Sequence, residues 1–288
     1  MRNLLLIIVL VSLQINVFAQ SLEELVDETY KDSTENKETF ATFKSVRLIN
    51  SHTIKNPAKN EFNFLIQHRF GYLTEGFSEM FGLDDANLRI GFEYGLFDKL
   101  ALGYGRSTFK KNYDIYAKYK LLSQNNQEKL IPFSMSILGV TNISSAKKPY
   151  ASQDFLFTHR LSYTLQVLIA RKFNNAISIQ LMPTYIHRNL SPSINDANDL
   201  FAIGIGGRIK FTNRLAFTYE YHYSLPDMIS EAYVNPLSLG IDIETGGHVF
   251  QLFFTNASAT YDAGFIPETS SDWLNNEIRF GFNLLRTF

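Results

Sequence analysis

The sequence predicts an all-β chain: a transmembrane, antiparallel, up-and-down β-barrel of about 12 strands, preceded by a short N-terminal periplasmic segment. Three observations indicate this class. Apolar and polar residues alternate with a period of two in segments of roughly 10 residues, the length of a membrane-spanning strand. The chain carries 25 Phe and 15 Tyr at a net charge of −1, which suits a barrel that displays aromatic side chains to lipid. Its last segment, 278–288, alternates almost to its end and closes on Phe288.

The first 19 residues have the pattern of a secretory signal peptide. A short positively charged start precedes an apolar stretch, 4–13, and a small-x-small-like cleavage site ends at Ala19. After the signal peptide there is no run of about 18 apolar residues, so we expect no transmembrane helix. The chain contains no cysteine, which excludes a lipid anchor on cysteine, disulfides and thiolate metal sites. We therefore expect the outer membrane of a Gram-negative bacterium.

Residues 20–59 differ from the rest of the chain in being polar and charged. The stretch 43–54 favours an extended conformation, and Asn56-Pro57 breaks it. We interpret 20–59 as a periplasmic lead-in or as a plug that folds back into the lumen, and 60–288 as the barrel.

Six alternating segments make up the first half of the barrel. In the second of them, Leu88, Ile90 and Phe92 share one face while Arg89 and Glu93 share the other, as the two faces of a strand require. The predicted strands are 61–70, 87–96, 100–106, 113–121, 131–140 and 155–170, the last being the longest.

The second half repeats this pattern. Its predicted strands are 176–185, 201–211, 215–223, 236–244, 248–255 and 278–288. The last strand resembles the signal by which outer-membrane barrels engage their insertion machinery, carried here by Phe280, Phe282, Leu284 and Phe288. Arg286 departs from that signal, because an apolar residue is usual at its position.

The connections between these segments alternate between short and long. Short ones include Asp98-Lys99 and Gly246-Gly247, and long ones include 73–86 and 256–275. Outer-membrane barrels have short periplasmic turns and longer outer loops. If the first strand rises from the periplasm, the long connections lie outside and twelve strands return the C-terminus to the periplasm.

A soluble all-β protein is the alternative, since sandwiches also alternate. Their outward residues are polar, however, whereas here the second face holds the small and charged residues, among them Gly204, Gly206, Arg208 and Glu220. This face suits a crowded, hydrated lumen. A barrel in lipid must also be closed, because open strand edges do not survive in hydrocarbon.

Several stretches resemble a known family. They are FGLDDANLRIGFEYGL, GYGRSTFKKNYDIYAKYKLL, LIARKF, LMPTYIHRNL, GIGGRIK and DIETGGHVFQLFFTN, and they are similar to an uncharacterised outer-membrane β-barrel family of Bacteroidota-type bacteria, a domain of unknown function. The resemblance covers most of the mature chain, and the DIETGGHVFQL string is its most specific part. It implies a barrel in the outer membrane, and it implies no catalytic residue, substrate or cofactor.

Charges of both signs occupy the lumen-facing positions. Because charges removed from water must pair, one interpretation is a salt-bridge ladder that stiffens the wall, and the other is a selective path for a small solute lined by the same groups. The candidate residues are Arg89, Glu93, Arg160, Arg208, Lys210, Glu220, Asp242, Glu244 and Arg279.

Metal and catalytic sites find little support in the sequence. Asp242, Glu244 and His248 surround one turn and have ligand chemistry, but the two carboxylates pair more readily with cross-strand Arg208, Lys210 or Arg279. No serine stands beside a histidine in a recognisable catalytic arrangement, including Ser51 and His52 in the lead-in. We expect no cofactor, no metal and no enzyme activity, a lipid-acting hydrolase being the remote alternative.

Two functions stay open. The first is passive passage or binding of a small solute through a narrow, mixed-charge lumen. The second is a closed structural or docking barrel whose extracellular loops bind a partner. The expected partners are outer-membrane lipid, the barrel-insertion machinery and a small solute, and the near-neutral charge argues against nucleic acid.

Overall fold

The computed structural model describes residue 39 and residues 41–288, apart from 126–130, 148–154 and 194–195. The expected signal peptide, 1–19, and most of the first half of the lead-in lie outside the described residues. The whole barrel lies within residues 39–288.

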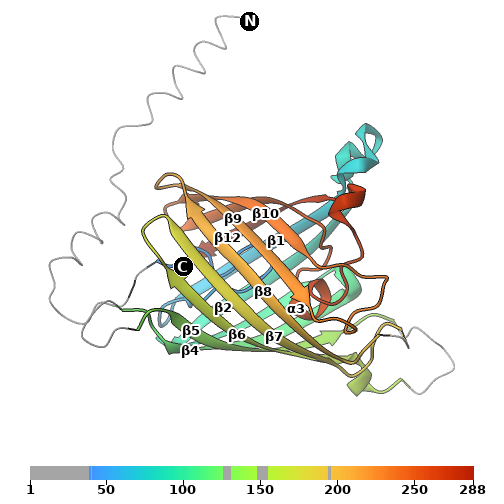
Figure 1. Ribbon diagram of the computed structural model, residues 1–288, viewed down its shortest axis with the longest axis horizontal. Coiled ribbons are helices and arrows are strands. Elements are labelled where there is room, and N and C mark those ends of the chain that lie inside the picture. Colours follow the sequence, from blue (N-terminus) through green and yellow to red (C-terminus); the bar gives the residue numbers. More distant parts are fainter. Residues whose placement is uncertain (1–38, 40, 126–130, 148–154, 194–195) are drawn as a thin grey trace, which may run out of the picture. The chain divides into compact units, whose positions relative to one another are not determined.

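Twelve antiparallel strands form a closed barrel in which each strand pairs with its neighbours in sequence and β1 closes on β12 (Figure 1). The predicted fold class and strand count are confirmed. The strands are β1 (Phe62–Tyr72), β2 (Ala86–Phe97), β3 (Leu100–Ser107), β4 (Asn112–Leu122), β5 (Ser134–Ser144), β6 (Leu161–Lys172), β7 (Ile177–Arg188), β8 (Asp199–Lys210), β9 (Leu215–Ser224), β10 (Leu237–Thr245), β11 (His248–Thr255) and β12 (Arg279–Thr287).

Helical elements are short and lie in the connections. Among the described residues no helix has the length and apolar character needed to cross a membrane. They are η2 (Leu73–Glu75), η3 (Phe77–Gly82), η4 (Phe109–Lys111), η5 (Phe157–Arg160), α3 (Asp262–Phe265) and η6 (Trp273–Asn275).

Alternation along the strands divides the side chains between two environments. In β1 every second residue is buried, and β7, β9 and β11 repeat the pattern. Large apolar side chains dominate the outer face, for example Ile115, Leu165, Ile203 and Leu252, which are 43–52% exposed. The outer wall is therefore apolar, as a barrel surrounded by lipid requires.

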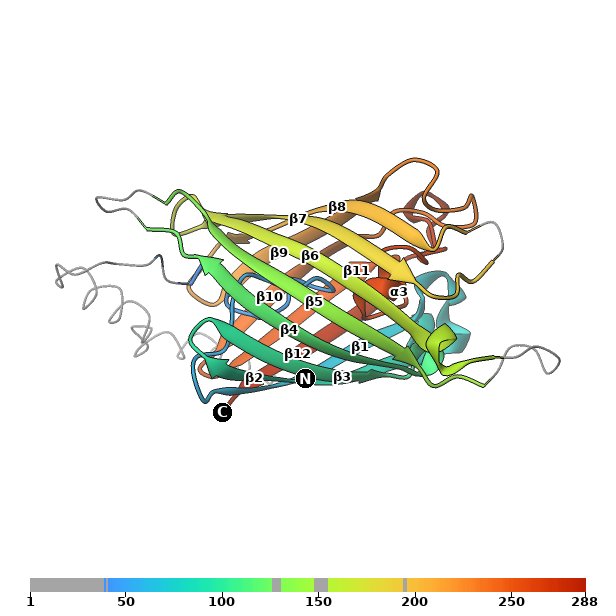
Figure 2. The ribbon, with the colours of Figure 1, turned by 90° about the horizontal axis from the view of Figure 1, so that it is seen from below.

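The two ends of the barrel differ (Figure 2). At one end, here called the turn end, lie connections such as Asp98-Lys99 and Gly246-Gly247, and Gly247 adopts a φ of 92° that its turn requires. At the other end, the loop end, lie the described parts of the remaining connections, namely 73–85, 108–111, 145–147, 155–160, 189–193, 196–198, 225–236 and 256–278.

The sixth strand is shorter at its start than the predicted 155–170. β6 begins at Leu161, and the short helix η5 takes the place of residues 157–160 of the predicted strand. The reason is the register: β5 pairs with β6 no further than Ile143 opposite Leu161. Beyond that pair Arg160 donates hydrogen bonds to the carbonyl oxygens of Ser144 and Ala146 instead of extending a ladder.

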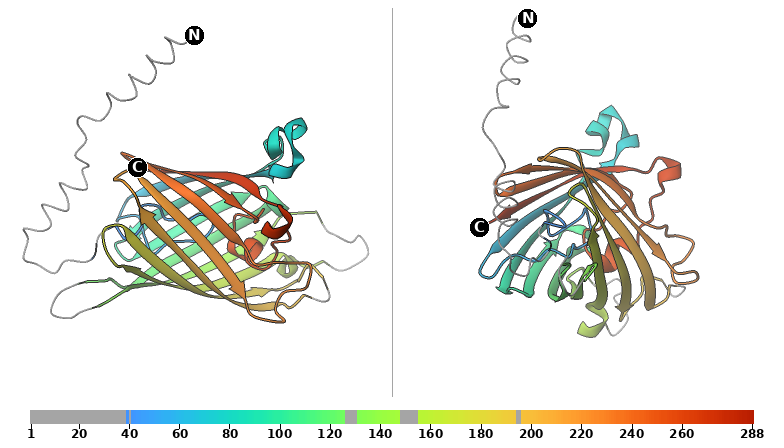
Figure 3. Two further views of the ribbon diagram at one scale, coloured as in Figure 1. Left: turned by 45° about the horizontal axis from the view of Figure 1, so that its top comes forward. Right: turned by 60° about the vertical axis from the view of Figure 1, so that its left-hand side comes forward.

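Two segments fold into the barrel (Figure 3). Residues 41–58, here called the N-terminal hairpin, dip in from the turn end and return to β1. Residues 256–271, here called the β11–β12 insert, include α3 and lie toward the loop end. Inward-facing apolar residues pack against both: Leu168 and Met182 contact the hairpin, and Ile186 and Leu200 contact the insert. The lumen is therefore filled by the chain's own residues.

Candidate functional site: the occupied lumen

The N-terminal hairpin is a tight turn stabilised by its own backbone. The backbone N–H of Leu48 donates to the carbonyl of Ser51 (2.9 Å), and that of Thr53 donates to Val46 (3.0 Å). Arg47 and His52 form an isolated antiparallel bridge, and the Arg47 guanidinium donates to the Asn50 carbonyl (2.9 Å). The tip, residues 48–51, is at most 1% exposed.

Glu220 on β9 binds the tip of the hairpin. Its carboxylate accepts the backbone N–H groups of Asn50 (2.8 Å), Ser51 (3.0 Å) and Ile49 (3.4 Å). It also accepts the Asn50 side-chain amide at 2.6 Å. Charge-assisted bonds of this kind are stronger than neutral ones, so one buried carboxylate holds the turn by its main chain.

Three strands on the other side of the tip supply donors. Arg69 on β1 donates to the Asn50 side-chain oxygen (2.7 Å) and to the Ile49 carbonyl (3.3 Å). Asn283 on β12 also donates to the Ile49 carbonyl, at 2.8 Å. Gln251 on β11 donates to the carbonyls of Arg47 (3.2 Å) and Leu48.

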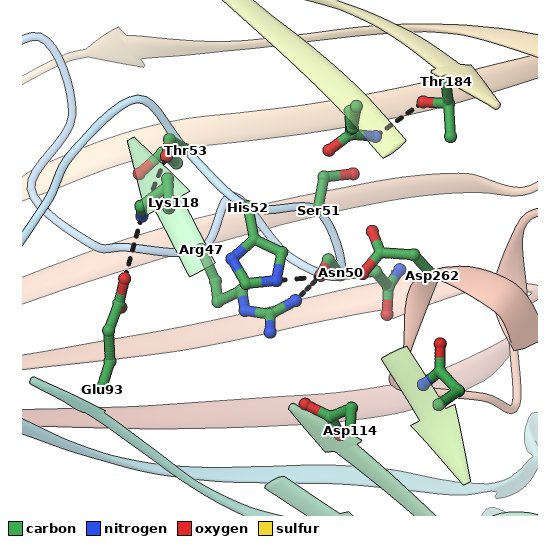
Figure 4. Close-up of polar contacts among 12 residues, drawn as sticks. Arg47, Asn50, Ser51, His52, Thr53, Glu93, Asp114, Lys118, Thr184 and Asp262 are labelled. Carbon is green, nitrogen blue, oxygen red and sulfur yellow. Dashed lines mark hydrogen bonds and ion pairs between the residues drawn. The ribbon is translucent and has the colours of Figure 1, made fainter. Parts of the chain in front are cut away.

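Two further wall residues hold the returning arm of the hairpin. Gln180 on β7 accepts the Ile54 N–H and donates to the His52 carbonyl, at 2.8 and 2.7 Å. Lys118 on β4 donates to the carbonyls of Thr53 (3.2 Å) and Lys55 (2.5 Å). Figure 4 shows Lys118 between Thr53 and Glu93.

The β11–β12 insert crosses the lumen nearer the loop end. Thr260 donates to the Ser107 hydroxyl of β3 at 3.2 Å, whereas Phe265 stands edge-on to the His222 ring of β9 with 5.2 Å between ring centroids. Its apolar residues bury themselves against inward-facing residues of β7 and β8, namely Ile186, Leu200 and Ala202.

The two segments meet at His52 and Asp262 (Figure 4), whose Nε2 and Oδ2 atoms are 3.8 Å apart. Burial lowers the pKa of His52 well below its ordinary value, and burial raises the pKa of Asp262 to about 6. Both shifts favour neutral forms. The contact is therefore a polar one between buried groups rather than a strong ion pair, and it brings the N-terminal hairpin against the β11–β12 insert.

Some of the predicted lumen charges form separate ion pairs. Arg89 donates to both carboxylate oxygens of Asp114 across β2 and β4, and Lys118 lies 3.0 Å from Glu93. Near the turn end Arg208 pairs with Glu244. The pairs lie on different parts of the wall.

The remaining candidates have other surroundings. Asp242 accepts from Gln251 (2.9 Å) and Thr218 (3.4 Å) rather than from an arginine. Arg279 donates to the Phe70 carbonyl (3.2 Å) and lies over the Tyr72 ring. Arg160 belongs to the loop end, as described above, and Lys210 is half-buried at the end of β8.

The residues weighed for catalysis and metal binding are placed as follows. Ser51 Oγ lies 2.7 Å from His222 Nε2, and both residues are fully buried. This pairing joins the hairpin to β9, and sequence reasoning did not bring the two residues together. Asp242 and Glu244 point to other partners, and His248 stacks on Phe250. Among the residues that the structure describes, no group of three His, Cys, Asp or Glu side chains is placed to hold a metal ion.

The C-terminal residues lie on the outer wall. Phe280 stacks on Phe70, Phe282 stacks on His68, and Phe288 contacts Phe62. They therefore extend an aromatic surface across the seam between β12 and β1.

Sequence reasoning missed the polar wall residues that bind the hairpin, Gln180, Gln251 and Asn283, because it selected charges. Their inward positions follow from strand parity, but nothing local indicates that their partners are main-chain groups far away in sequence.

Solved structures with similar folds are porins and related outer-membrane barrels. A NanC porin has a TM-score of 0.49 and 8% identity, covering 79% of this chain and 98% of that one. A KdgM porin in complex with disordered oligogalacturonate has a TM-score of 0.49 and 9% identity, covering 79% and 99%. The Acinetobacter baumannii outer membrane protein Omp33 has a TM-score of 0.44 and 8% identity, covering 80% and 99%.

A comparison with curated proteins found no match. A family model does match, and it covers residues 43–288, which include all twelve strands and nearly the whole hairpin. The chain belongs to the family of membrane-bound β-barrel domains named DUF5777.

Proposed function

We propose that this chain is an outer-membrane barrel that passes small solutes and is closed at rest by its N-terminal hairpin. The observation that carries the proposal is the occupied lumen: wall residues from β1, β4, β7, β9, β10, β11 and β12 bind residues 47–55. Passage then requires withdrawal of the hairpin.

The hairpin is better suited to withdrawal than the β11–β12 insert. Its tip is bound by many hydrogen bonds, and water can replace these partners when the hairpin leaves. Its apolar side chains pack in two small, separate clusters on the wall. Both arms of the hairpin reach the turn end, where Thr39 donates to Gln124 and Asn60 donates to Gly95. The insert, by contrast, buries a cluster of apolar residues that includes Phe265 and Ile266, whose exposure to water is costly.

Location in the outer membrane follows from the same proposal. The signal peptide at 1–19 would direct export, and residues 20–59 would form the lead-in whose second half is the hairpin. Phe280, Phe282, Leu284 and Phe288 would engage the insertion machinery, since they lie on the outer wall at the last strand.

Ion conductance through planar bilayers tests the proposal with a locked and a weakened hairpin. A Cβ built on Gly206 lies 2.6 Å from Leu48 Cδ1 and 2.9 Å from the Tyr219 carbonyl oxygen. With a small shift of the backbone at Tyr219, the double variant L48C/G206C therefore brings two thiols within reach of a disulfide. The chain has no other cysteine. The weakened variant L48A/N50A alters only the hairpin and leaves the wall intact.

We expect no current steps from the oxidised L48C/G206C protein, and behaviour like that of the unaltered chain after reduction. We expect frequent steps from L48A/N50A. A folded L48A/N50A barrel, recognised by its heat-modifiable migration on gels, that never conducts would refute passage.

A closed docking barrel is the second candidate, and one observation favours it. The connection 73–85 exposes Phe77 (79%), Met80 (47%) and Phe81 (51%) near Glu75 and Glu79, a combination that suits a partner protein with basic and apolar groups. This function gains support if L48A/N50A stays silent while the variant F77S/F81S loses a partner that the unaltered protein retains.

A further inference from the structure

The wall recognises the hairpin chiefly through its peptide backbone. Between residues 47 and 55, carbonyl oxygens of six residues accept hydrogen bonds from wall side chains, and four backbone N–H groups donate to wall side chains. The carbonyls are those of Arg47, Leu48, Ile49, His52, Thr53 and Lys55, and the N–H groups are those of Ile49, Asn50, Ser51 and Ile54.

We propose that the lumen is a binding site for short peptides, which its own N-terminal hairpin occupies at rest. The inference rests on the proposed function, because a peptide can enter only while the hairpin is withdrawn. It names the class of solute that the same site accepts.

Gln180 gives the most specific indication. Its side-chain amide accepts one backbone N–H, from Ile54, and donates to one backbone carbonyl, of His52. This two-point pairing matches the donor and acceptor that a peptide strand presents on one edge. Sugars lack such a fixed alternation of N–H and carbonyl groups.

Glu220, Gln251 and Asn283 supply the complementary groups at the tip. Glu220 accepts three successive N–H groups, while Gln251 and Asn283 donate to three successive carbonyls. Because these contacts ignore side chains, any peptide that adopts a similar turn can make them.

Apolar pockets flank the polar contacts. Leu48 and Ile54 pack with Leu168, Ala170 and Met182, and Val46 packs with Leu65, Val249 and Leu285. These wall residues face inward and lie among the polar residues that bind the hairpin backbone. Aliphatic side chains of a peptide can fill the pockets that the hairpin vacates, whereas the hydroxyls of a sugar would be left without partners there.

Block of the L48A/N50A current tests the inference. The probes are a capped, uncharged tetrapeptide of alanine and leucine and a neutral trisaccharide of similar mass. We expect the peptide to block at a concentration at least about 10-fold below that of the trisaccharide.

Two wall variants in the L48A/N50A background make the test specific. Q180L removes the two-point pairing, so the half-blocking peptide concentration should rise about 10-fold. Q166L is the matched control, because Gln166 faces the lumen but bonds to the wall residue Thr184 at 2.7 Å, and it should change nothing.

The outcomes separate the two proposals. If no folded variant conducts, the proposal that the barrel passes solutes is wrong, and so is the proposal of a peptide site. A current that peptide and trisaccharide block alike, or that Q180L leaves unchanged, overturns the peptide site alone.

The single variant L48C answers the same question if L48A/N50A does not fold. Leu48 is 1% exposed, so a thiol at this position reacts with a maleimide only when the hairpin leaves. Excess tetrapeptide should speed this labelling about 10-fold, and the trisaccharide should not. Equal labelling rates with and without peptide contradict the inference.

Discussion

Removal of the Asn50 side chain should open the barrel. The Asn50 amide donates to Glu220 (2.6 Å) and Ser238 (3.0 Å), and its oxygen accepts from the Arg69 guanidinium (2.7 Å). A hydrogen bond to a charged group contributes about 1.5–3 kcal/mol and a neutral one about 0.5–1.5 kcal/mol. These bonds share partners with the backbone of the tip, so they are not additive. We take about 3 kcal/mol for the N50A substitution, which corresponds to a roughly 150-fold change in the ratio of withdrawn to inserted hairpin.

Single-channel recording measures this ratio as the fraction of time spent conducting. As long as both proteins are closed most of the time, the variant N50A should conduct for a fraction of time about 150-fold larger than that of the unaltered chain. The single-channel conductance should not change, since the substitution removes only a hairpin side chain. N142A is a control, because Asn142 is equally buried but bonds to Asn112 of the wall. The reasoning fails if folded N50A conducts no more often than N142A.

Three further predictions concern the insert, a buried ion pair and the return of the hairpin into β1. Burial raises the pKa of Asp262 from 3.8 to about 6, so the stabilisation that comes from its buried protonated form is full below about pH 4 and is lost as the pH rises through about 6. As the pH falls from 7.5 to 5, the thermal midpoint of the unaltered chain should therefore rise relative to that of D262N, and a constant difference between the two midpoints would contradict this. D114N leaves the fully buried Arg89 without its carboxylate and should cost about 3–5 kcal/mol of unfolding free energy, more than R89M/D114L costs, as denaturant titration in detergent can check. A Cβ on Gly95 would lie 1.9 Å from the Ala58 carbonyl oxygen, whereas one on Gly139 meets nothing within 4 Å; G95V should therefore raise the maleimide reactivity of L48C, and G139V should leave it unchanged.

Much of the wall could be predicted from sequence because its physics is local. A strand exposed to lipid on one face must alternate, so parity placed Arg89, Glu220 and Asp242 inward without knowledge of their partners. The start of β6 could not be predicted in this way. Residues 155–160 continue the alternation, but their partner strand β5 ends at Ser144, and strand length depends on the neighbour.

The segments that occupy the lumen were much harder to predict from the sequence. Residues 46–54 contact wall residues more than 100 positions away, such as Gln180 and Glu220, and most of these contacts involve backbone atoms that any sequence provides. The β11–β12 insert did leave a signal. Ala257, Ala259, Ala263, Phe265 and Ile266 are unusually apolar for an exposed loop, and all are buried. A long connection with such a composition is better interpreted as folded inward.

The position of the hairpin in the lumen is tested most directly by cross-linking in native membranes. Oxidised L48C/G206C protein should yield, after trypsin, a disulfide-linked pair of peptides, 48–55 and 189–208, whereas L48C paired with G139C, on the outward face of β5, should yield none. Quantitative linkage of position 48 to position 206 would place the tip of the hairpin against β8 as described. Free thiols at both positions in folded, oxidised protein would show that the lumen is not occupied by residues 41–58, and closure by the hairpin would be wrong.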